Sequence, residues 1–287
     1  MSGRAHHTDY DEETTARCER ALLTLLGDLG PWRERIYLAG GLVPRYLVGR
    51  LPEGARGHVG TTDVDLIIGL ALGDETPETY RTLQNNLESA HFAQKEPSFR
   101  WARDVEGATV LVEFLCETAE VEPGRILRPK GESTGSKLAA FNVRGAHLVR
   151  DDFIEHEIEG ERLDGGGLSR VAVRVANVLP YTVLKILAFQ DRHENKDAYD
   201  LVFTLFHYAG GPRACGRAAA SSPSAAHPQA SEALALLGER FSDADQDGPS
   251  AYSLFLASPD DEEEKARLRR EAVATVRAFL RGVGDVG

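Results

Sequence analysis

The chain has 287 residues, of which 42% are hydrophobic and 27% are charged, and its formal net charge is −12. This length and composition are typical of a soluble globular protein with one large or two modest domains. The negative charge argues against general binding to DNA and against binding to anionic membranes.

The predicted localisation is the cytoplasm. The three cysteines, Cys18, Cys116 and Cys215, form neither a metal-binding spacing nor a disulfide framework, which fits a reducing compartment. The first ten residues contain no apolar segment that resembles a signal peptide. No window approaches the roughly 18 apolar residues of a transmembrane helix, so we expect no membrane partner.

The first part of the chain predicts alternating helices and strands. Apolar residues at helical spacing predict helices at 11–29, 42–48 and 77–91. Short apolar runs predict strands at 36–39, 64–68, 108–116, 153–158 and 171–175. Pro52 and several glycines predict a loop at 51–61.

The second part of the chain reads as helical from Pro180 onward, with a break predicted at 193–195. Residues 210–231 are rich in Gly, Pro, Ala and Ser without periodicity, so we expect a flexible surface loop there. A short helix at 232–241 and a last helix starting at Ser258 complete the prediction.

Two aspartates stand at the start of a predicted buried strand. Asp63 and Asp65 are two residues apart, so their side chains share a face, roughly 7 Å apart at Cα. Burying two carboxylates at that distance is costly unless a cation such as Mg²⁺ lies between them. The pair predicts a divalent metal site that bridges phosphates. The alternative is a pair of strand-end aspartates in turn hydrogen bonds.

Glu113 is a third carboxylate and interrupts the apolar run 108–116. A carboxylate in that setting needs a positive partner, which is either a metal or a basic side chain. A two-metal site would require such a third ligand beside Asp63 and Asp65. A structural ion pair is the alternative.

Gly40 and Gly41 separate a predicted strand from a predicted helix. Glycines at such a turn let the backbone approach a triphosphate closely and present amides near a helix N-terminus, although any tight turn uses them. Arg45 follows one turn later and is either a phosphate ligand or a surface residue.

A further charged group stands in the helical part of the chain. Lys185 lies among apolar residues, where a lysine is costly without an anionic partner. A triphosphate would serve, and so would Asp197 or Asp200. Arg192 would share the face of Lys185 in a continuous helix and is a candidate nucleotide contact.

Three motifs together resemble a known family. They are Ala39-Gly-Gly, Thr62-Asp-Val-Asp-Leu, and Leu184-Lys-Ile-Leu-Ala-Phe-Gln-Asp-Arg joined to Lys196-Asp-Ala-Tyr-Asp-Leu. In this order they resemble the nucleotidyltransferase family of the AbiEii/AbiGii and MenT toxins, within the DNA polymerase β-like superfamily. The resemblance covers roughly residues 30–208.

The resemblance implies transfer of a nucleoside monophosphate from an NTP, with Mg²⁺ as cofactor. Matched motif to motif, Asp63 and Asp65 would hold the metal. Lys185 would contact the triphosphate, and Asp197 or Asp200 would complete the site. In the toxin members, the acceptor is the 3′ end of tRNA or a related target, and a cognate antitoxin protein restrains the enzyme.

The resemblance also implies an α+β fold, with a small mixed β-sheet nucleotidyltransferase core and flanking helices. We expect this core, with its N-terminal helix, at residues 1–178. We expect a C-terminal helical region carrying the lysine and aspartate motif at residues 179–287.

Two other functions stay open. One is a nucleotidyltransferase for a small molecule of the aminoglycoside type, since a polycationic acceptor suits an acidic protein. The other is a non-catalytic homologue that binds nucleotide or a protein partner. Hydrolase triads and P-loop ATPases are poor interpretations, because the sequence contains no Gly-x-Ser-x-Gly elbow and no P-loop.

Overall fold

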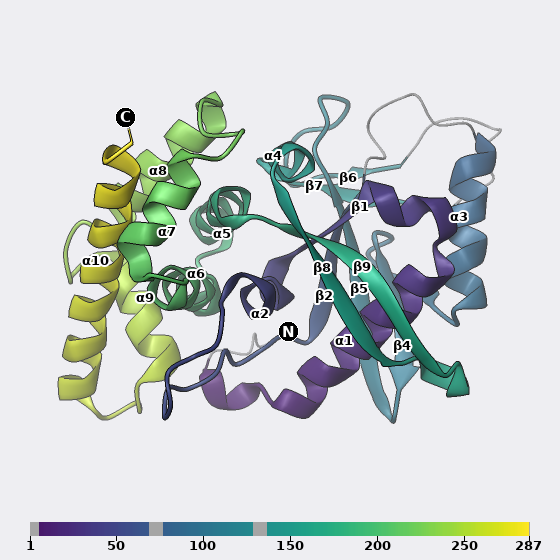
Figure 1. Cartoon of the computed structure of the whole chain (residues 1–287), viewed down its shortest axis with the longest axis horizontal. Coiled ribbons are helices and arrows are strands. Elements are labelled where there is room, and N and C mark those ends of the chain that lie inside the picture. Colours follow the sequence, from purple (N-terminus) through teal and green to yellow (C-terminus); the bar gives the residue numbers. More distant parts are fainter. Residues whose placement is uncertain (1–5, 69–76, 129–136, 287) are drawn as a thin grey trace. The chain divides into compact units, whose positions relative to one another are not determined.

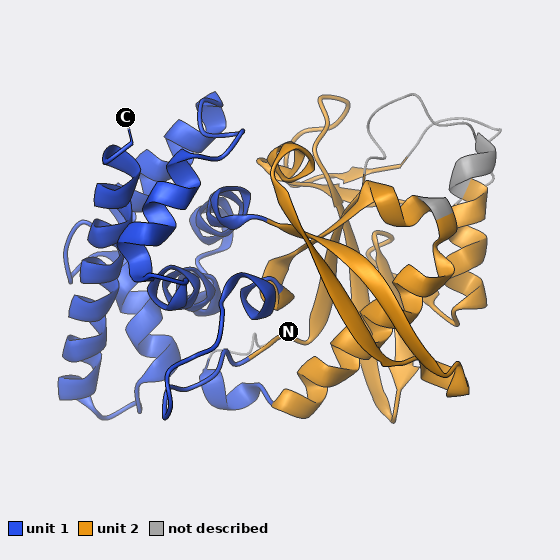
Figure 2. Ribbon diagram, in the orientation of Figure 1, with its two compact units in different colours: residues 1–11, 43–59, 177–287 blue, residues 12–42, 60–176 orange. Residues whose placement is uncertain are grey.

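The computed structural model describes residues 6–68, 77–128 and 137–286. The chain has an α+β fold and divides into two compact units (Figures 1 and 2). Unit 1 comprises residues 1–11, 43–59 and 177–287, and unit 2 comprises residues 12–42 and 60–176. Unit 1 thus includes residues 1–11, 43–59 and 177–178 from the region that we predicted as the core.

Unit 2 contains a β-sheet with both parallel and antiparallel strand pairs, which confirms the predicted mixed sheet. Seven strands follow the order β3-β4-β5-β2-β1-β9-β8, while β7 pairs with β5 and β6 pairs with β7. Their bounds are β1 (Ile36–Ala39), β2 (Asp63–Ile68), β3 (Ala93–Lys95), β4 (Arg100–Val105), β5 (Ala108–Cys116), β6 (Ile126–Leu127), β7 (Ala140–Asn142), β8 (Phe153–Glu161) and β9 (Leu168–Ala176). Strand β1 is antiparallel to β2, whereas β2 and β5 are parallel.

The two faces of this sheet differ in chemistry. Alternation along β2 places Leu66 on one face and Asp65 on the other. The registers through β1, β9 and β8 put Gly160 on the Leu66 face. A Cβ at Gly160 would come within 3.2 Å of Leu23 on α1 (Glu12–Asp28), so α1 covers the Leu66 face. The aspartates of β2 therefore lie on the face opposite α1.

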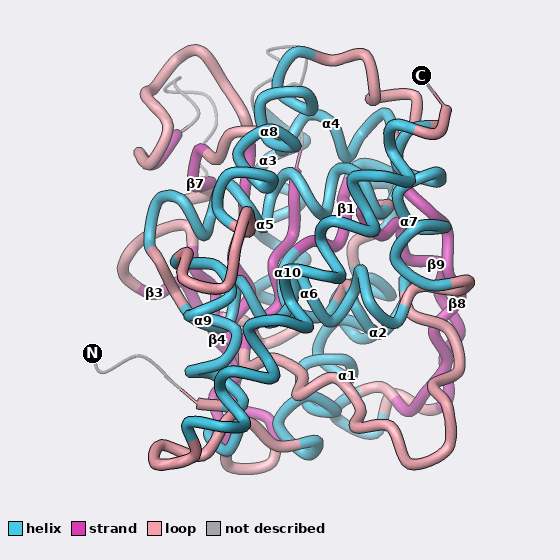
Figure 3. The backbone as a smooth tube through the Cα atoms, turned by 90° about the vertical axis from the view of Figure 1, so that its left-hand side faces the viewer, coloured by secondary structure: helices cyan, strands magenta, loops and turns pink. Residues whose placement is uncertain are grey.

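Among its described residues, unit 2 also contains the α-helices α3 (Pro77–Ser89) and α4 (Ala146–Asp151). Unit 1 is built from helices, which Figure 3 draws in cyan. Their bounds are α2 (Pro44–Leu47), α5 (Val178–Arg192), α6 (Asn195–His207), α7 (Gly211–Ala220), α8 (Pro228–Arg240), α9 (Asp247–Leu256) and α10 (Glu262–Gly284). Within the described residues, no helix is both long and apolar enough to cross a membrane.

The predicted loop at 210–231 was wrong for most of its length. Helix α7 occupies 211–220, and α8 begins at Pro228. The physical reason is close packing of α7 against α10. A Cβ at Gly216 would lie 2.0 Å from the Phe279 carbonyl oxygen, and one at Gly282 would lie 2.1 Å from the Arg213 carbonyl oxygen. The small residues that suggested a loop are those that let two helix backbones approach each other.

Two helix starts also differ from the prediction. Helix α5 begins at Val178, two residues before Pro180, because the Asn177 side chain accepts a hydrogen bond from the Val178 N–H at 2.8 Å. The last helix begins at Glu262, where Asp261 provides the N-cap. The break after α5 is confirmed, since the helix ends at Arg192 and its C-cap residue, His193, has a left-handed conformation.

Candidate functional site

The glycine turn and the aspartate pair meet in unit 2. Strand β1 ends at Ala39, which lies opposite Asp65 in the antiparallel register. The next residue, Gly40, has a φ of +69°. A Cβ at Gly40 would lie 1.7 Å from Asp65 Oδ2, so the carboxylate occupies the space that any other side chain would need. This contact requires glycine at position 40, and it brings two separate sequence motifs together.

Three carboxylates lie on one face of the sheet. Asp65 is directly opposite Glu113 in the parallel pairing of β2 with β5, and Asp63 lies two residues earlier on β2. Neighbouring strands are about 4.8 Å apart, and residues in register point to the same face. We call Asp63, Asp65 and Glu113 the carboxylate row. Arg100 on β4 continues the line beyond Glu113.

Arg100 is the positive partner that Glu113 needs. Its Nε donates a hydrogen bond to Glu113 Oε1 at 2.6 Å, and the two side chains are 30% and 13% exposed, respectively. The structure therefore contains the ion pair that was the alternative to a metal at this position. The role of Glu113 as a third metal ligand stays a prediction, and it would require the carboxylate to leave Arg100.

Asp63 and Asp65 have the donor chemistry that Mg²⁺ needs. Both side chains are half-buried on the face that α1 leaves uncovered. In residues 6–68, 77–128 and 137–286, no group of three or more His, Cys, Asp or Glu side chains is arranged to hold a metal ion. Mg²⁺ in nucleotide enzymes is usually bound by one or two carboxylates together with substrate phosphates. The aspartate pair thus fits a cation that arrives with a triphosphate.

The lysine and aspartate motif forms a separate cluster in unit 1. Lys185 Nζ donates to Asp200 at 2.6 Å and to Asp197 at 3.1 Å. Arg192 binds Asp197 through two nitrogens, each at 2.7 Å, and Lys196 Nζ lies 2.8 Å from both Asp200 oxygens. We call these five residues the ion cluster. It holds α5 and α6 together through charged side chains.

Burial and charge act against each other in the ion cluster. The Asp197 and Asp200 side chains are 1% and 0% exposed. Burial alone would raise the pKa of Asp200, but Lys185 and Lys196 outweigh it and hold that pKa well below its usual range. Burial alone would lower the pKa of Lys185, but Asp200 and Asp197 raise it well above normal. Both carboxylates and the ammonium group are therefore charged at neutral pH.

His58 completes the surroundings of Asp200. Its Nε2–H donates to Asp200 Oδ1 at 2.8 Å, and its ring stacks on Tyr199 with centroids 5.3 Å apart. The Val59 N–H donates to the Tyr199 hydroxyl oxygen at 3.1 Å. Burial lowers the pKa of His58 to about 4, even though Asp200 favours the charged ring. A neutral histidine thus anchors the end of segment 43–59 to α6.

The predicted site residues divide between the units. Those of unit 2 are Gly40, Gly41, Asp63, Asp65 and Glu113. Those of unit 1 are Arg45, Lys185, Arg192, Asp197 and Asp200. Arg45 is half-buried on the four-residue helix α2.

Comparison with known proteins does not place this chain in a family. The chain matches no family model, no curated protein and no solved structure. The function of this chain is therefore inferred from its motifs and from the geometry of the two clusters.

Sequence reasoning missed three residues of these sites. Thr61 donates a hydrogen bond to Asp63 Oδ1 at 2.7 Å, but it lies before β2 with a bend at Thr62, so no strand periodicity signalled this contact. Arg100 was missed together with β4, whose mixed polar and apolar residues hide the strand. His58 carried no sequence signal, because 142 residues separate it from Asp200.

Proposed function

We propose that this protein is a Mg²⁺-dependent nucleotidyltransferase. It would move a nucleoside monophosphate from an NTP to an acceptor hydroxyl, with the 3′ end of tRNA or another RNA as the acceptor. The observation that carries this proposal is the packing of the Asp65 carboxylate against Gly40, with Asp63 on the same face of β2. A glycine turn beside paired carboxylates is an arrangement suited to a metal-bound triphosphate.

Each part of this arrangement would have a distinct task. Backbone amides of the Gly40–Gly41 turn would bind phosphate oxygens, which glycine permits at close approach. Asp63 and Asp65 would hold Mg²⁺, which, when bound, neutralises the charge on the phosphates. The acceptor oxygen would form a bond to the α-phosphorus and lose its proton to solvent, while the bond from that phosphorus to pyrophosphate would break. Catalysis would come mainly from positioning and charge stabilisation.

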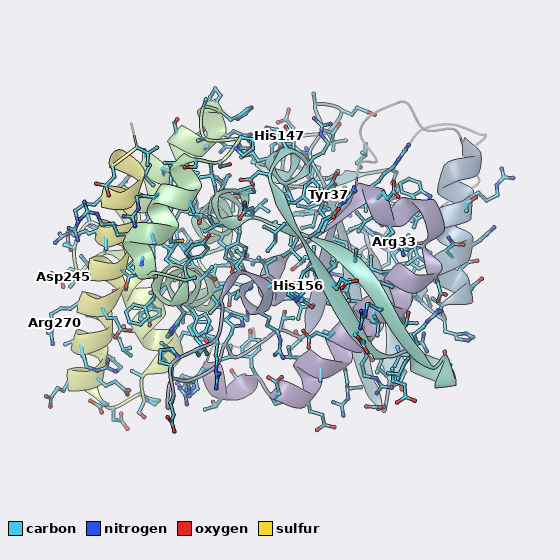
Figure 4. All side chains as sticks on the ribbon, viewed as in Figure 1. Arg33, Tyr37, His147, His156, Asp245 and Arg270 are labelled. Carbon is cyan, nitrogen blue, oxygen red and sulfur yellow. The ribbon has the colours of Figure 1, made fainter. Side chains whose placement is uncertain are left out.

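The direct test is transfer of label from each α-³²P-labelled NTP, with Mg²⁺, into total cellular RNA. Asp63→Asn and Asp65→Asn keep the side-chain shape but remove the charge. We expect each to reduce labelling of a tRNA-sized band by at least about 100-fold. Asp245→Asn is the matched control, because Asp245 is an exposed carboxylate of unit 1 (Figure 4), and it should label like the wild type. Full activity in Asp63→Asn would contradict the proposal.

One observation favours a second candidate, a protein that binds nucleotide without turnover. The Lys185 ammonium group, which the resemblance assigns to the triphosphate, is held by two carboxylates instead. NTP binding without pyrophosphate release, whether RNA or an aminoglycoside is offered, would support this candidate. Pyrophosphate release with the aminoglycoside alone would assign a small-molecule acceptor. The antitoxin partner implied by the resemblance stays a prediction.

A further inference from the structure

Thr61 connects the carboxylate row to helix α1. Its hydroxyl group donates to Asp63 Oδ1 at 2.7 Å. A hydroxyl donor at this distance restricts the rotation of a carboxylate and fixes which oxygen faces outward. Asp63 is half-buried, so without this hydrogen bond its carboxylate would have several rotamers available.

The Thr61 backbone is itself held by buried side chains of α1, chiefly Thr15, with the Cys18 thiol also donating to the Thr61 carbonyl oxygen at 3.9 Å. The Thr61 N–H donates to Thr15 Oγ1 at 3.2 Å, and the Thr15 hydroxyl donates to the Thr61 carbonyl oxygen at 3.4 Å. Thr15 and Thr61 are 0% and 4% exposed. Thr15 belongs to α1, the helix that packs across the sheet. One hydroxyl therefore fastens both polar groups of the Thr61 backbone to a rigid element.

The residue before Thr61 must be glycine for this contact to form. Gly60 has a φ of +84°, and a Cβ there would lie 1.8 Å from Thr15 Oγ1. Any side chain would displace Thr15 from the Thr61 backbone. Gly60 therefore leaves space for Thr15, and Thr15 holds the Thr61 backbone. The Thr61 hydroxyl group in turn donates to Asp63.

We propose that Thr61 is a positioning residue for Asp63, and that Thr15 and Gly60 hold Thr61 in place. This inference rests on the proposed function, because it assigns the purpose of the hydrogen bond to metal binding. Hydrogen-bond partners of metal ligands orient those ligands, and their loss typically weakens metal binding by about 10- to 100-fold.

The test measures metal binding directly, without turnover. Mn²⁺, as a spectroscopic substitute for Mg²⁺, is titrated into the full-length protein with a non-hydrolysable NTP analogue, and free Mn²⁺ is followed by electron paramagnetic resonance. Thr61→Val removes the hydroxyl group at nearly constant shape and should raise the Kd for Mn²⁺ by about 10- to 100-fold. Thr61→Ser keeps the hydroxyl group and should stay near the wild-type Kd.

The matched control is Thr62→Val, which makes the same chemical change one residue away, at a half-buried position before β2. It should bind Mn²⁺ like the wild type. Thr61→Ala gives a second hydroxyl deletion in case valine disturbs the packing. A wild-type Kd in Thr61→Val or Thr61→Ala would overturn the inference. Failure of both variants to fold would also overturn it, because Thr61 would then be a structural residue.

Asp63→Asn separates this inference from the proposed function. Loss of Mn²⁺ binding in Asp63→Asn, together with normal binding in Thr61→Val, would reject only the positioning role. Normal Mn²⁺ binding in Asp63→Asn would reject the proposed metal site itself.

Discussion

The carboxylate row of unit 2 and the ion cluster of unit 1 contain similar residues in opposite environments. Asp197 and Asp200 are almost completely buried and are neutralised by lysine and arginine side chains. Asp63 and Asp65 are half-buried, and Asp63 accepts a hydrogen bond from a hydroxyl group. A buried carboxylate with its own cations is equipped to hold helices together. A half-buried carboxylate that accepts a hydrogen bond from a hydroxyl group keeps the chemistry to bind a cation from solution.

The largest expected effect is the loss of stability when the ion cluster is disrupted. Lys185→Met leaves Asp197 and Asp200 buried without their shared ammonium group, so we expect the free energy of unfolding to fall by about 3–5 kcal/mol. Urea denaturation followed by circular dichroism measures this change. Lys95→Met replaces an exposed lysine of β3 and should change stability by no more than about 0.5 kcal/mol.

The same variant also tests the role that the resemblance gives to Lys185. If Lys185→Met abolishes NTP binding while its stability stays near the wild-type value, the ion cluster is not the main task of this lysine. The ion cluster would then bind a ligand, as we propose for the carboxylate row, and the two carboxylate groups would no longer differ in function.

The next effect concerns pH and His58. Its pKa is about 4 in the folded protein and 6.5 for an ordinary histidine, because burial disfavours the charged ring. Between these values the unfolded chain binds a proton that the folded protein does not. The contribution of the neutral His58 ring to the free energy of unfolding is therefore complete above pH 6.5. It is lost as the pH falls towards 4, by about 3 kcal/mol in total.

Thermal unfolding between pH 4 and pH 7 measures the His58 contribution. His58→Gln keeps a donor for Asp200 but does not titrate, so its stability should depend less on pH over this interval. Equal pH dependence in the variant and the wild type would show that other groups control acid unfolding.

The smallest expected effect concerns the carboxylate row and tests whether Glu113 can be a metal ligand. Arg100→Met removes one ion-pair partner of Glu113, and because this pair is partly exposed, the free energy of unfolding should fall by about 1 kcal/mol. Because Glu113 lies directly opposite Asp65, its released carboxylate should tighten Mn²⁺ binding by a few-fold. The double variant Arg100→Met, Glu113→Gln should lose that gain. If the gain persists in the double variant, Glu113 is not a metal ligand.

Local patterns were sufficient for much of the fold. The apolar run 108–116 matched β5 at both ends, and the predicted strand 36–39 matched β1. Helix α1 was likewise predicted to within one residue at each end. Such elements are visible because their own residues carry the period and length that burial on a sheet or helix requires.

Composition misled where small residues serve packing. Gly216 lies inside α7, against the backbone of α10, yet glycine next to alanine and proline resembles a linker. The partner helix begins at residue 262, so no local window contains the contact that explains the glycine.

In the candidate site, too, some features follow from local sequence and others depend on distant contacts. By itself, the sequence determined that Asp63 and Asp65 share a strand face, because side-chain alternation is a local property of an extended chain. It also showed that Lys185 needs an anionic partner, because a charged group among apolar residues must be compensated.

Only the tertiary structure decided which partners these groups have. Asp65 packs on Gly40, Glu113 binds Arg100, and Lys185 binds Asp197 and Asp200. Each choice depends on strand register or helix packing, which no residue sets alone, because many distant contacts contribute to it at once.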